Sequence, residues 1–345
     1  MKVDYIVVGL GLAGIAFCEQ LLANNKSFVV IDSGHNTSST VAGGLYNPVI
    51  LKRFTPAWNA EMQLKTAIPY YKKLEHNLGI KLVYTTPVFR LFASVEEQNR
   101  WFEVSDKPGL DPFIAKQIHR NTNTHIEAPF GFGEVYQSGR VDTSLLIKAY
   151  KNKMIKEHTL IESPFEYEEL IINKTIEYGN ISASKIVFAE GYGLINNPYF
   201  NFLPLTGNKG ELITIKAEQL NLDSIIKSGV FIIPDGDNQF RVGATYNPFD
   251  KTTTPTEEAR TELLKKLNRF LKCDFKIVKH QAGIRPTTKD RKPLLGCHPE
   301  FENVFVLNGL GSRGVLIAPT VAVNLYDFIE KSIPLDKEIS IERFL

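Results

Sequence analysis

Buried-strand and helix patterns alternate at the start of the chain. The apolar run Tyr5–Val8 predicts a buried strand, and apolar residues recur at helical spacing from Ile15 to Leu22. A second apolar run, Phe28–Ile31, predicts another buried strand. This strand–helix–strand order is typical of a parallel α/β unit.

Helical periodicity and capping residues predict further helices along the chain. They are expected at Pro56–Leu78, from Ser94, within Gly139–Lys156 after a turn and with a cap at Asp142, and from Thr254 to about Lys272. In the last of these, Pro255 would take the first position and Glu257 would complete a capping box. The stretch from Lys107 to Gly133 is rich in Pro, Gly and Asn and predicts loops.

Strand signals divide the chain into two kinds of segment. Lys185–Gly193 and Asn303–Asn308 read as buried strands that each end in a turn, the second leading into a helix to about Lys331. Apolar and polar residues alternate from Leu203 to Thr245, which indicates an antiparallel sheet. We therefore expect a discontinuous Rossmann-type α/β domain with an inserted mixed, largely antiparallel α+β substrate domain. The first would comprise residues 1–82, 138–198 and 282–345, and the second residues 83–137 and 199–281.

The first turn carries a dinucleotide-binding fingerprint. Gly9-x-Gly11-x-x-Gly14 lies between the first strand and its helix, and Asp32 closes the second strand. The three glycines allow a tight turn, close approach to a pyrophosphate and close helix packing, while the acid can bind a ribose diol. A glycine-rich turn without a ligand is the alternative, but the complete strand–helix–strand context favours a dinucleotide site.

Composition narrows the class of protein. The 345 residues are 43% hydrophobic and 23% charged, and a net charge of +2 makes no electrostatic case for nucleic acid or membrane. Cys18, Cys273 and Cys297 are far apart, which indicates reduced thiols, and the histidines show no metal-ligand spacing. The N-terminal apolar run is too short to span a bilayer and lacks a cleavage site, so a cytoplasmic protein is expected.

Motifs along nearly the whole chain resemble one enzyme family. These motifs, in this order, are "KGELITI", "RVGATYNPFDKTTTPTEE", "AGIRPTTKDRKPLLGCHPE" and "NGLGSRGVLIAP". With the N-terminal fingerprint they resemble the FAD-dependent D-amino acid oxidase superfamily. The glycine and sarcosine oxidase branch is most similar, together with the oxidase domain of the tRNA wobble-uridine modifying enzyme.

The resemblance implies a set of FAD-binding residues. The ADP half of FAD and its pyrophosphate would lie against the N-terminal fingerprint and the small-residue segment after it, with a third turn beside the cofactor: Gly9, Gly11, Gly14, Asp32, Ser33, Thr40, Gly43, Gly44, Leu45, Ala189 and Gly191. The isoalloxazine would lie against the C-terminal loop: Gly309, Gly311, Ser312, Arg313, Gly314, Val315 and Leu316. Independently of the family, a glycine-rich loop entering a helix aims N–H groups at one spot, where they would favour reduction of the flavin. Cys297 lies too late in the pattern for a covalent link, so non-covalent FAD is expected.

Arg285 is the leading candidate on the substrate side. Its apolar neighbours predict a buried guanidinium, which needs an anionic partner. From the residues alone, an internal acid and a substrate carboxylate both remain open. In glycine-oxidase-like enzymes the matching arginine binds the substrate carboxylate, and Arg313 and Tyr246 are further catalytic candidates. Phe231 departs from the family, because a tyrosine is expected there in glycine oxidases.

The expected activity is FAD-dependent oxidation of a C–N bond in a carboxylate-bearing amine or amino acid. Hydride would pass to flavin N5, and the resulting imine would be hydrolysed. The main alternative is a tRNA carboxymethylaminomethyl-uridine oxidoreductase, in which the same arginine would bind a tRNA-borne carboxylate. A nicotinamide-dependent dehydrogenase and a non-catalytic FAD-binding module are the other classes.

Overall fold

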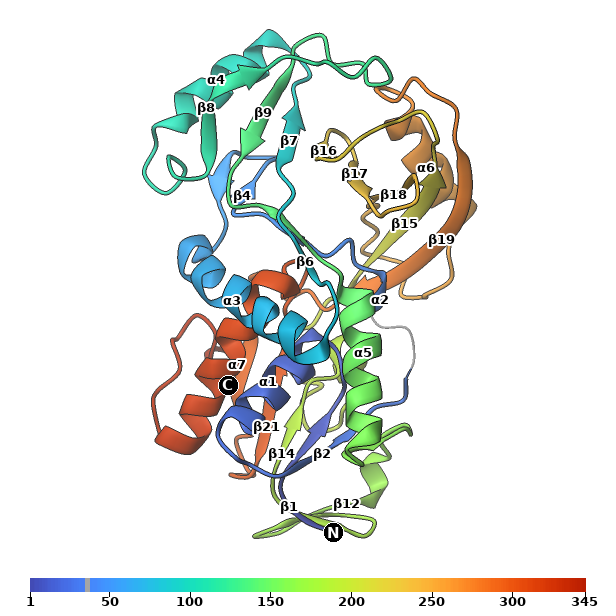
Figure 1. Ribbon diagram of the computed structural model, residues 1–345. Helices are drawn as coiled ribbons and strands as arrows, with labels where there is room; N and C mark the ends of the chain where they lie inside the picture. Colours follow the sequence, from blue (N-terminus) through green and yellow to red (C-terminus); the bar gives the residue numbers. More distant parts are fainter. Residues whose placement is uncertain (35–37) are drawn as a thin grey trace.

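Two β-sheets organise the chain into two lobes (Figure 1). The computed structural model describes residues 1–34 and 38–345. The N-terminal strand and the C-terminal helix lie in the same lobe, while the middle of the chain supplies most of the other.

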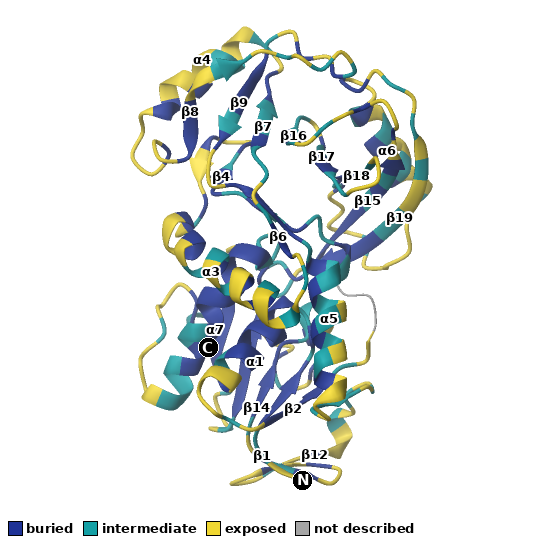
Figure 2. Ribbon diagram, viewed as in Figure 1, coloured by how far each residue is buried: buried dark blue, intermediate teal, exposed yellow. Residues whose placement is uncertain are grey.

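The first sheet has a parallel centre. Its order is β11 (Leu160–Ile161), β2 (Phe28–Ile31), β1 (Lys2–Val8), β14 (Ile181–Phe188) and β21 (Val304–Asn308), with β20 (Leu294–Cys297) antiparallel at the edge. The hairpin β12 (Leu170–Ile172) and β13 (Ile176–Tyr178) pairs with the start of β14. Figure 2 shows most of the central parallel strands as buried, since all of β2 and β21 and the C-terminal residues of β1 and β14 are buried, as expected of a sheet covered on both faces.

Alternate residues of β1 serve two separate cores. Tyr5 and Val7 pack with the helices α1 (Leu12–Ala23), α3 (Ala60–Leu78), α5 (Thr143–Lys156) and α7 (Gly314–Lys331). Ile6 and Val8 belong to a second cluster with the segment after β14, which includes the 3₁₀ helix η2 (Gly191–Asn196). Burial in these two hydrophobic cores, on opposite faces of the sheet, therefore stabilises the same strand.

The second sheet is mostly antiparallel. Its order is β19 (Lys276–Arg285), β15 (Asn208–Lys216), β18 (Gln239–Gly243), β17 (Phe231–Pro234), β16 (Ile225–Lys227), β7 (Val88–Leu91), β9 (Phe132–Val135) and β8 (Ile114–His119). Helix α6 (Glu257–Leu267) contributes Leu263 and Leu267 to the core on one face of this sheet. Helix α4 (Val95–Ser105) contacts β8.

Short elements complete the structure between and around the lobes. They are α2 (Ser38–Val41), the small sheets of β3 (Leu45–Tyr46), β10 (Gly139–Val141) and β6 (Val83–Tyr84) and of β4 (Val49–Ile50) and β5 (Thr55–Pro56), and the 3₁₀ helices η1 (Tyr167–Glu169) and η3 (Ile341–Phe344). The first sheet lies wholly within residues 1–82, 138–198 and 282–345, and only the end of β19 crosses from the second sheet into that part of the chain. On this distribution we propose the same division of the chain into two domains.

Several predicted elements differ from the structure. Helix α6 begins at Glu257 with Thr256 as its N-cap and ends at Leu267, so the predicted start at Thr254 and end near Lys272 are wrong. The carbonyl of Thr254 instead accepts a hydrogen bond from the buried Lys209, which holds the chain outside the helix. The predicted loop region 107–133 contains the strand β8. By contrast, the predicted caps of α4 and α5 are confirmed, since Ser94 and Asp142 each accept a backbone N–H.

Candidate functional site

A cavity of about 920 Å³ is lined by residues from both lobes. This volume lies at the upper end of the range for small-molecule and cofactor sites. The carboxyl ends of β1, β2 and β14 open into it from one side, and the inner face of the second sheet forms the other. The carboxyl end of a parallel sheet is where α/β folds bind nucleotides.

The turn between β1 and α1 shows why its glycines are needed. Gly9 has a φ of +97°, and a Cβ on Gly14 would lie 2.0 Å from the carbonyl oxygen of Gly9. Any side chain at Gly14 would therefore force the helix away from the strand. A Cβ on Gly11 would meet only the Ser39 hydroxyl, at 3.5 Å, and Gly11 lines the cavity. The division of roles matches the one expected of a pyrophosphate-binding turn.

The N-terminus of α1 supplies donors to this cavity. Gly11 is the N-cap and has no side chain to cap the helix, and the Leu12 N–H donates to the Ser39 hydroxyl at 3.4 Å. The next N–H groups and the positive dipole end of the helix face the lining. Asp32 supports the turn, because its Oδ1 accepts the Leu10 N–H at 2.9 Å and its Oδ2 the Gly34 N–H at 3.0 Å. A carboxylate has further lone pairs, so Asp32 can still accept hydrogen bonds from a ribose.

Most of the cofactor residues expected from the sequence line this one cavity. They are Gly9, Gly11, Asp32, Ser33, Gly43, Gly44, Leu45, Ala189, Gly191, Gly311, Ser312, Arg313, Gly314, Val315 and Leu316. Gly14, Thr40 and Gly309 lie beside the lining rather than in it. Gly309 has a φ of +73° and packs against Leu294 and Thr288, which is a structural role in the turn.

Two hydrogen bonds bring the distant segments of the lining together. The Asn308 amide donates to the Gly191 carbonyl at 2.9 Å, and the Gly311 N–H donates to the Pro286 carbonyl at 2.9 Å. The loop after β21 is thus tied to the turn after β14 and to the residue next to Arg285. Helix α7 begins at Gly314 without a side-chain cap, so the N–H groups of its first turn also face the cavity.

Arg285 is a partly buried cation without an acidic partner. Its guanidinium donates to Asn208 Oδ1 at 3.2 Å and to the Thr245 carbonyl at 3.4 Å. Across residues 1–34 and 38–345, no carboxylate lies within ion-pair distance of it. Burial lowers the pKa of Arg285 from its ordinary value, but a guanidinium stays protonated. The internal acid left open by the sequence is not found among the described residues.

The other two catalytic candidates differ in their surroundings. Arg313 lines the cavity, and burial together with Arg291 lowers the pKa of its guanidinium. Tyr246 also lines the cavity, but 67% of its surface is exposed, so it lies at the mouth. These positions make Arg285 and Arg313 the better placed groups for an enclosed anion.

Lys227 is a further cation in the lining that the sequence did not single out. Its Nζ lies 4.5 Å from the centroid of the Phe231 ring. Burial, with repulsion from Arg90 and Lys266, lowers its pKa to about 8. Glu190 also lines the cavity; burial raises the pKa of this carboxyl, whose oxygens accept from the Tyr167 hydroxyl and the Asn197 amide.

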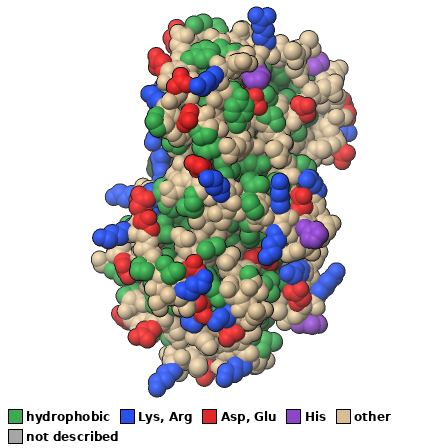
Figure 3. All heavy atoms as spheres, turned by 60° about the vertical axis from the view of Figure 1, so that its left-hand side comes forward, with side chains coloured by type: hydrophobic (Ala, Val, Ile, Leu, Met, Phe, Trp, Pro, Cys, Tyr) green, Lys and Arg blue, Asp and Glu red, His purple; other side chains and the backbone are tan. Residues whose placement is uncertain are grey.

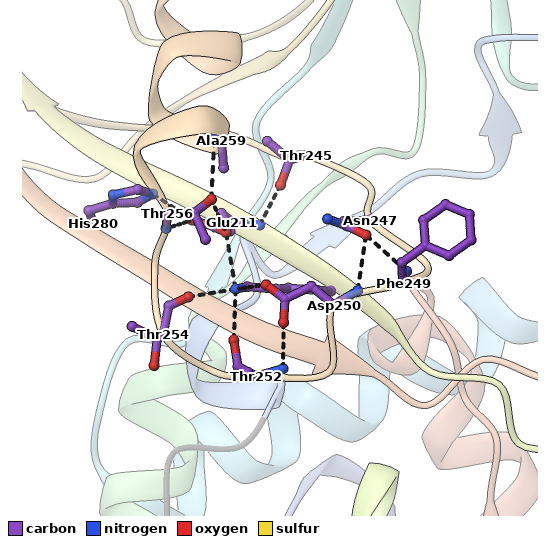
Figure 4. A network of polar contacts seen from close by, with 11 residues as sticks. Glu211, Thr245, Asn247, Phe249, Asp250, Thr252, Thr254, Thr256, Ala259 and His280 are labelled. Atoms are coloured by element: carbon purple, nitrogen blue, oxygen red, sulfur yellow. Dashed lines mark hydrogen bonds and ion pairs between the residues drawn. The ribbon is translucent and has the colours of Figure 1, made fainter.

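A polar network holds the loop at the cavity mouth (Figure 4). Lys209 is 1% exposed, and its ammonium donates to Asp250 at 2.6 Å, to Thr252 at 3.1 Å and to the Thr254 carbonyl at 2.5 Å. The neighbouring Glu211 accepts from the N–H and hydroxyl of Thr256. This loop follows Tyr246, and in the sequence the network was signalled only by the motifs "KGELITI" and "RVGATYNPFDKTTTPTEE".

Gly210 is another residue of the site that sequence reasoning missed. It lines the cavity between Lys209 and Glu211, and the Arg285 guanidinium lies directly over it. A Cβ on Gly210 would be 2.0 Å from Nη2 and 2.3 Å from Cζ of that arginine. The absence of a side chain at this position therefore makes room for the guanidinium.

Two other classes of site find no support in the described residues. Neither residues 1–34 nor 38–345 contain a group of three or more His, Cys, Asp or Glu side chains placed to hold a metal ion. Within the same residues, no helix combines the length and hydropathy needed to cross a bilayer.

Comparison with known proteins identifies the family. The family of FAD-dependent oxidoreductases, DAO, matches residues 4–327, and the chain belongs to it. Glycine oxidase from Bacillus subtilis (strain 168) is 26% identical over 375 residues, which cover 99% of this chain and 95% of that protein. The crystal structure of glycine oxidase from Geobacillus kaustophilus has a TM-score of 0.82 at 19% identity and covers 99% and 98% of the two chains.

A bifunctional protein is also similar. The tRNA 5-methylaminomethyl-2-thiouridine biosynthesis bifunctional protein MnmC of Marinobacter nauticus (strain ATCC 700491 / DSM 11845 / VT8) is 22% identical over 358 residues. The match covers 94% of this chain but 55% of that protein.

The protein is thus an FAD-dependent oxidoreductase, and its cavity fits the cofactor. The N-termini of α1 and α7, the open Gly11 and the acid at the end of β2 are the donor and acceptor set that a flavin dinucleotide requires. Cys18, Cys273 and Cys297 do not belong to the described lining, and non-covalent binding of FAD stays a prediction.

Proposed function

We propose that the protein oxidises the C–N bond of an amine or amino acid that carries a carboxylate. The observation that carries this proposal is the Arg285 guanidinium, which lines the FAD cavity with only neutral hydrogen-bond partners among the described residues. The relatives named glycine oxidase support an amino acid substrate.

The electrostatics of Arg285 favour an anionic ligand. A partly buried cation loses hydration, and its hydrogen bonds to Asn208 and Thr245 are 3.2–3.4 Å long. A carboxylate would replace the lost hydration with charge-assisted, bidentate hydrogen bonds. The side chain of Asn208 has an unpartnered Nδ2 beside the guanidinium, which is a further donor near the same position.

The chain's own residues would position the substrate rather than exchange protons with it. FAD supplies the two-electron acceptor that takes a hydride from the carbon attached to nitrogen. Arg285 would fix the carboxylate and so orient that carbon. If the amine binds in its neutral form, no side chain has to remove a proton. The carbon loses one hydride, the product is an iminium ion, and water hydrolyses it to a carbonyl compound and an amine or ammonia.

Substitution of Arg285 tests this proposal. We expect Arg285→Met to weaken binding of sarcosine to the FAD-loaded protein by roughly 12- to 140-fold, since a hydrogen bond to a charged group contributes about 1.5–3 kcal/mol. Arg285→Lys should recover part of the loss. Arg343 is paired with Asp290 outside the cavity lining, so Arg343→Met is the matched control. Unchanged sarcosine binding in Arg285→Met would refute the carboxylate role.

A tRNA-borne amine is the second candidate. Similarity to the bifunctional tRNA-modifying protein over 94% of this chain favours it, and the exposed Tyr246 at the mouth could stack on a base. However, the face in Figure 3 carries acidic and basic side chains interspersed, without a continuous basic surface. Filter binding of tRNA across salt concentrations separates the two candidates, because phosphate contacts make the affinity fall steeply with salt. Free-amine oxidation predicts weak binding without such a slope.

A further inference from the structure

Lys227 is a cavity cation for which neither the FAD site nor the carboxylate contact gives a role. It lies at the end of β16, and its ammonium stacks on Phe231 at 4.5 Å. Across residues 1–34 and 38–345 it forms no ion pair. The nearby cations Arg90 and Lys266 are paired with Glu97 and Glu262, so those acids are already engaged.

Sheet register places Lys227 on the same surface as the Arg285 guanidinium. Lys227 pairs with Phe231, Phe231 with Gly243, and Gly243 with Leu212. Leu212 and Gly210 are two residues apart on β15 and so share a face, and all five residues line the cavity. The guanidinium lies over Gly210 and the ammonium over Phe231. The two cations therefore occupy opposite ends of one surface.

The register also sets the separation of the two charges. Phe231 is two strands and two residues away from Gly210. With about 4.8 Å between strands and about 3.3 Å per residue, the backbones of Phe231 and Gly210 are roughly 12 Å apart, and we take this as the separation of the two charged groups that lie over them. An anion bound about 2.9 Å from each would leave about 6 Å between the anions. A chain of four to six bonds spans roughly 5–7 Å.

We propose that Lys227 and Phe231 form a second anion subsite, so that the preferred substrate is an amine carrying two carboxylates four to six bonds apart. This inference rests on the proposed function, since Arg285 must hold the first carboxylate. The Phe231 ring lies beside the Lys227 ammonium and has no hydroxyl to donate a hydrogen bond. Lys227 is therefore the donor of the subsite to the second carboxylate. The departure from the tyrosine expected at Phe231 thus coincides with a cation on the neighbouring strand.

Redox-inert ethers test the subsite by equilibrium binding. The probes are carboxymethoxy-alkanoates with one to four methylenes in the second arm, each matched to an alkoxyacetate of equal length without the second carboxylate. Binding to the FAD-loaded protein is measured from the change in flavin absorbance. We expect the best diacid to bind at least tenfold more tightly than its matched monoacid.

Three variants assign that difference to Lys227. Lys227→Met should abolish the diacid advantage and change alkoxyacetate binding by less than about twofold, while Lys227→Arg should retain the advantage. Lys216 is paired with Glu218 and lies outside the described lining, so Lys216→Met should leave both affinities unchanged. If Lys227→Met does not fold, Lys227→Gln serves instead.

The outcomes separate this inference from the proposed function. If alkoxyacetates bind but the diacids are no tighter, or if the advantage survives in Lys227→Met, the subsite is refuted and the Arg285 role stands. If alkoxyacetates fail to bind and no carboxylate-bearing amine bleaches the flavin, the proposed function fails and the subsite with it.

Discussion

Gly210→Ala tests the position of Arg285 without changing the arginine itself. Gly210 lies in β15 with a backbone that alanine can adopt. The new Cβ would lie 2.0–2.4 Å from three guanidinium atoms of Arg285, far inside contact distance. Because those atoms are the end of a flexible side chain, the arginine should move while the strand stays in place.

The displaced guanidinium should lose its bidentate contact with a carboxylate. That contact contributes about 1.5–3 kcal/mol, so the dissociation constant for an alkoxyacetate should rise roughly 12- to 140-fold. The assay is a titration followed by flavin absorbance, with thermal unfolding measured in parallel. Gly193→Ala is the matched control, because Gly193 also lines the cavity and a Cβ there would meet only Glu190 Cβ, at 3.7 Å.

The two measurements together decide the outcome. Weaker binding with a melting temperature close to that of the wild type supports the reasoning. Unchanged binding at an unchanged melting temperature would refute it, because the carboxylate would then not depend on the place that Arg285 occupies.

Three further predictions concern the cofactor, stability and pH. Gly11→Ala should fold normally but bind FAD at least tenfold more weakly in a fluorescence titration, because its methyl group would enter the pyrophosphate side of the cavity; full affinity would contradict that placement. Lys209→Met leaves the 2%-exposed Glu211 without its lysine and should lower the free energy of unfolding in urea by about 3–5 kcal/mol. The exposed Lys216→Met on the same strand should change it by less than about 0.5 kcal/mol, and equal losses would count against the network. Burial raises the pKa of Glu330, but hydrogen bonds from three donors outweigh burial and bring it from 4.5 to about 2. Stability from this carboxylate is present above pH 4.5 and is lost as the pH falls toward 2, so Glu330→Gln should show a shallower acid loss in urea unfolding than the wild type.

The sequence predicted β1, β2, β14 and β21, the central strands of the first sheet, because they are largely buried on both faces. Such strands read as continuous apolar runs, and glycine spacing located the turns that follow them. Strand β8 was missed because its buried and exposed residues do not alternate cleanly, and its pairing with β9 shifts register. The predicted start of α6 was wrong because Lys209, 45 residues earlier in the chain, donates a hydrogen bond to the Thr254 carbonyl.

The candidate site shows the same division between local and long-range information. Gly9, Gly11 and Asp32 could be predicted because their roles follow from one strand–turn–helix unit. The surroundings of Arg285 could not, since whether an acid faces it depends on side chains brought together from β15 and β18. The role of Gly210 depends in turn on the direction in which that arginine points.

The most direct test of the central claim is an anaerobic titration of the FAD-loaded protein with matched amines. Glycine, sarcosine and proline are compared with methylamine, dimethylamine and pyrrolidine, which lack the carboxylate, and iminodiacetate is compared with dimethylamine, which lacks both of its carboxylates. We predict that at least one carboxylate-bearing amine bleaches the flavin absorbance and that its counterpart does not. A flavin that is bleached equally by the counterparts, or by none of the carboxylate-bearing amines, would contradict the proposal that Arg285 selects a carboxylate-bearing amine.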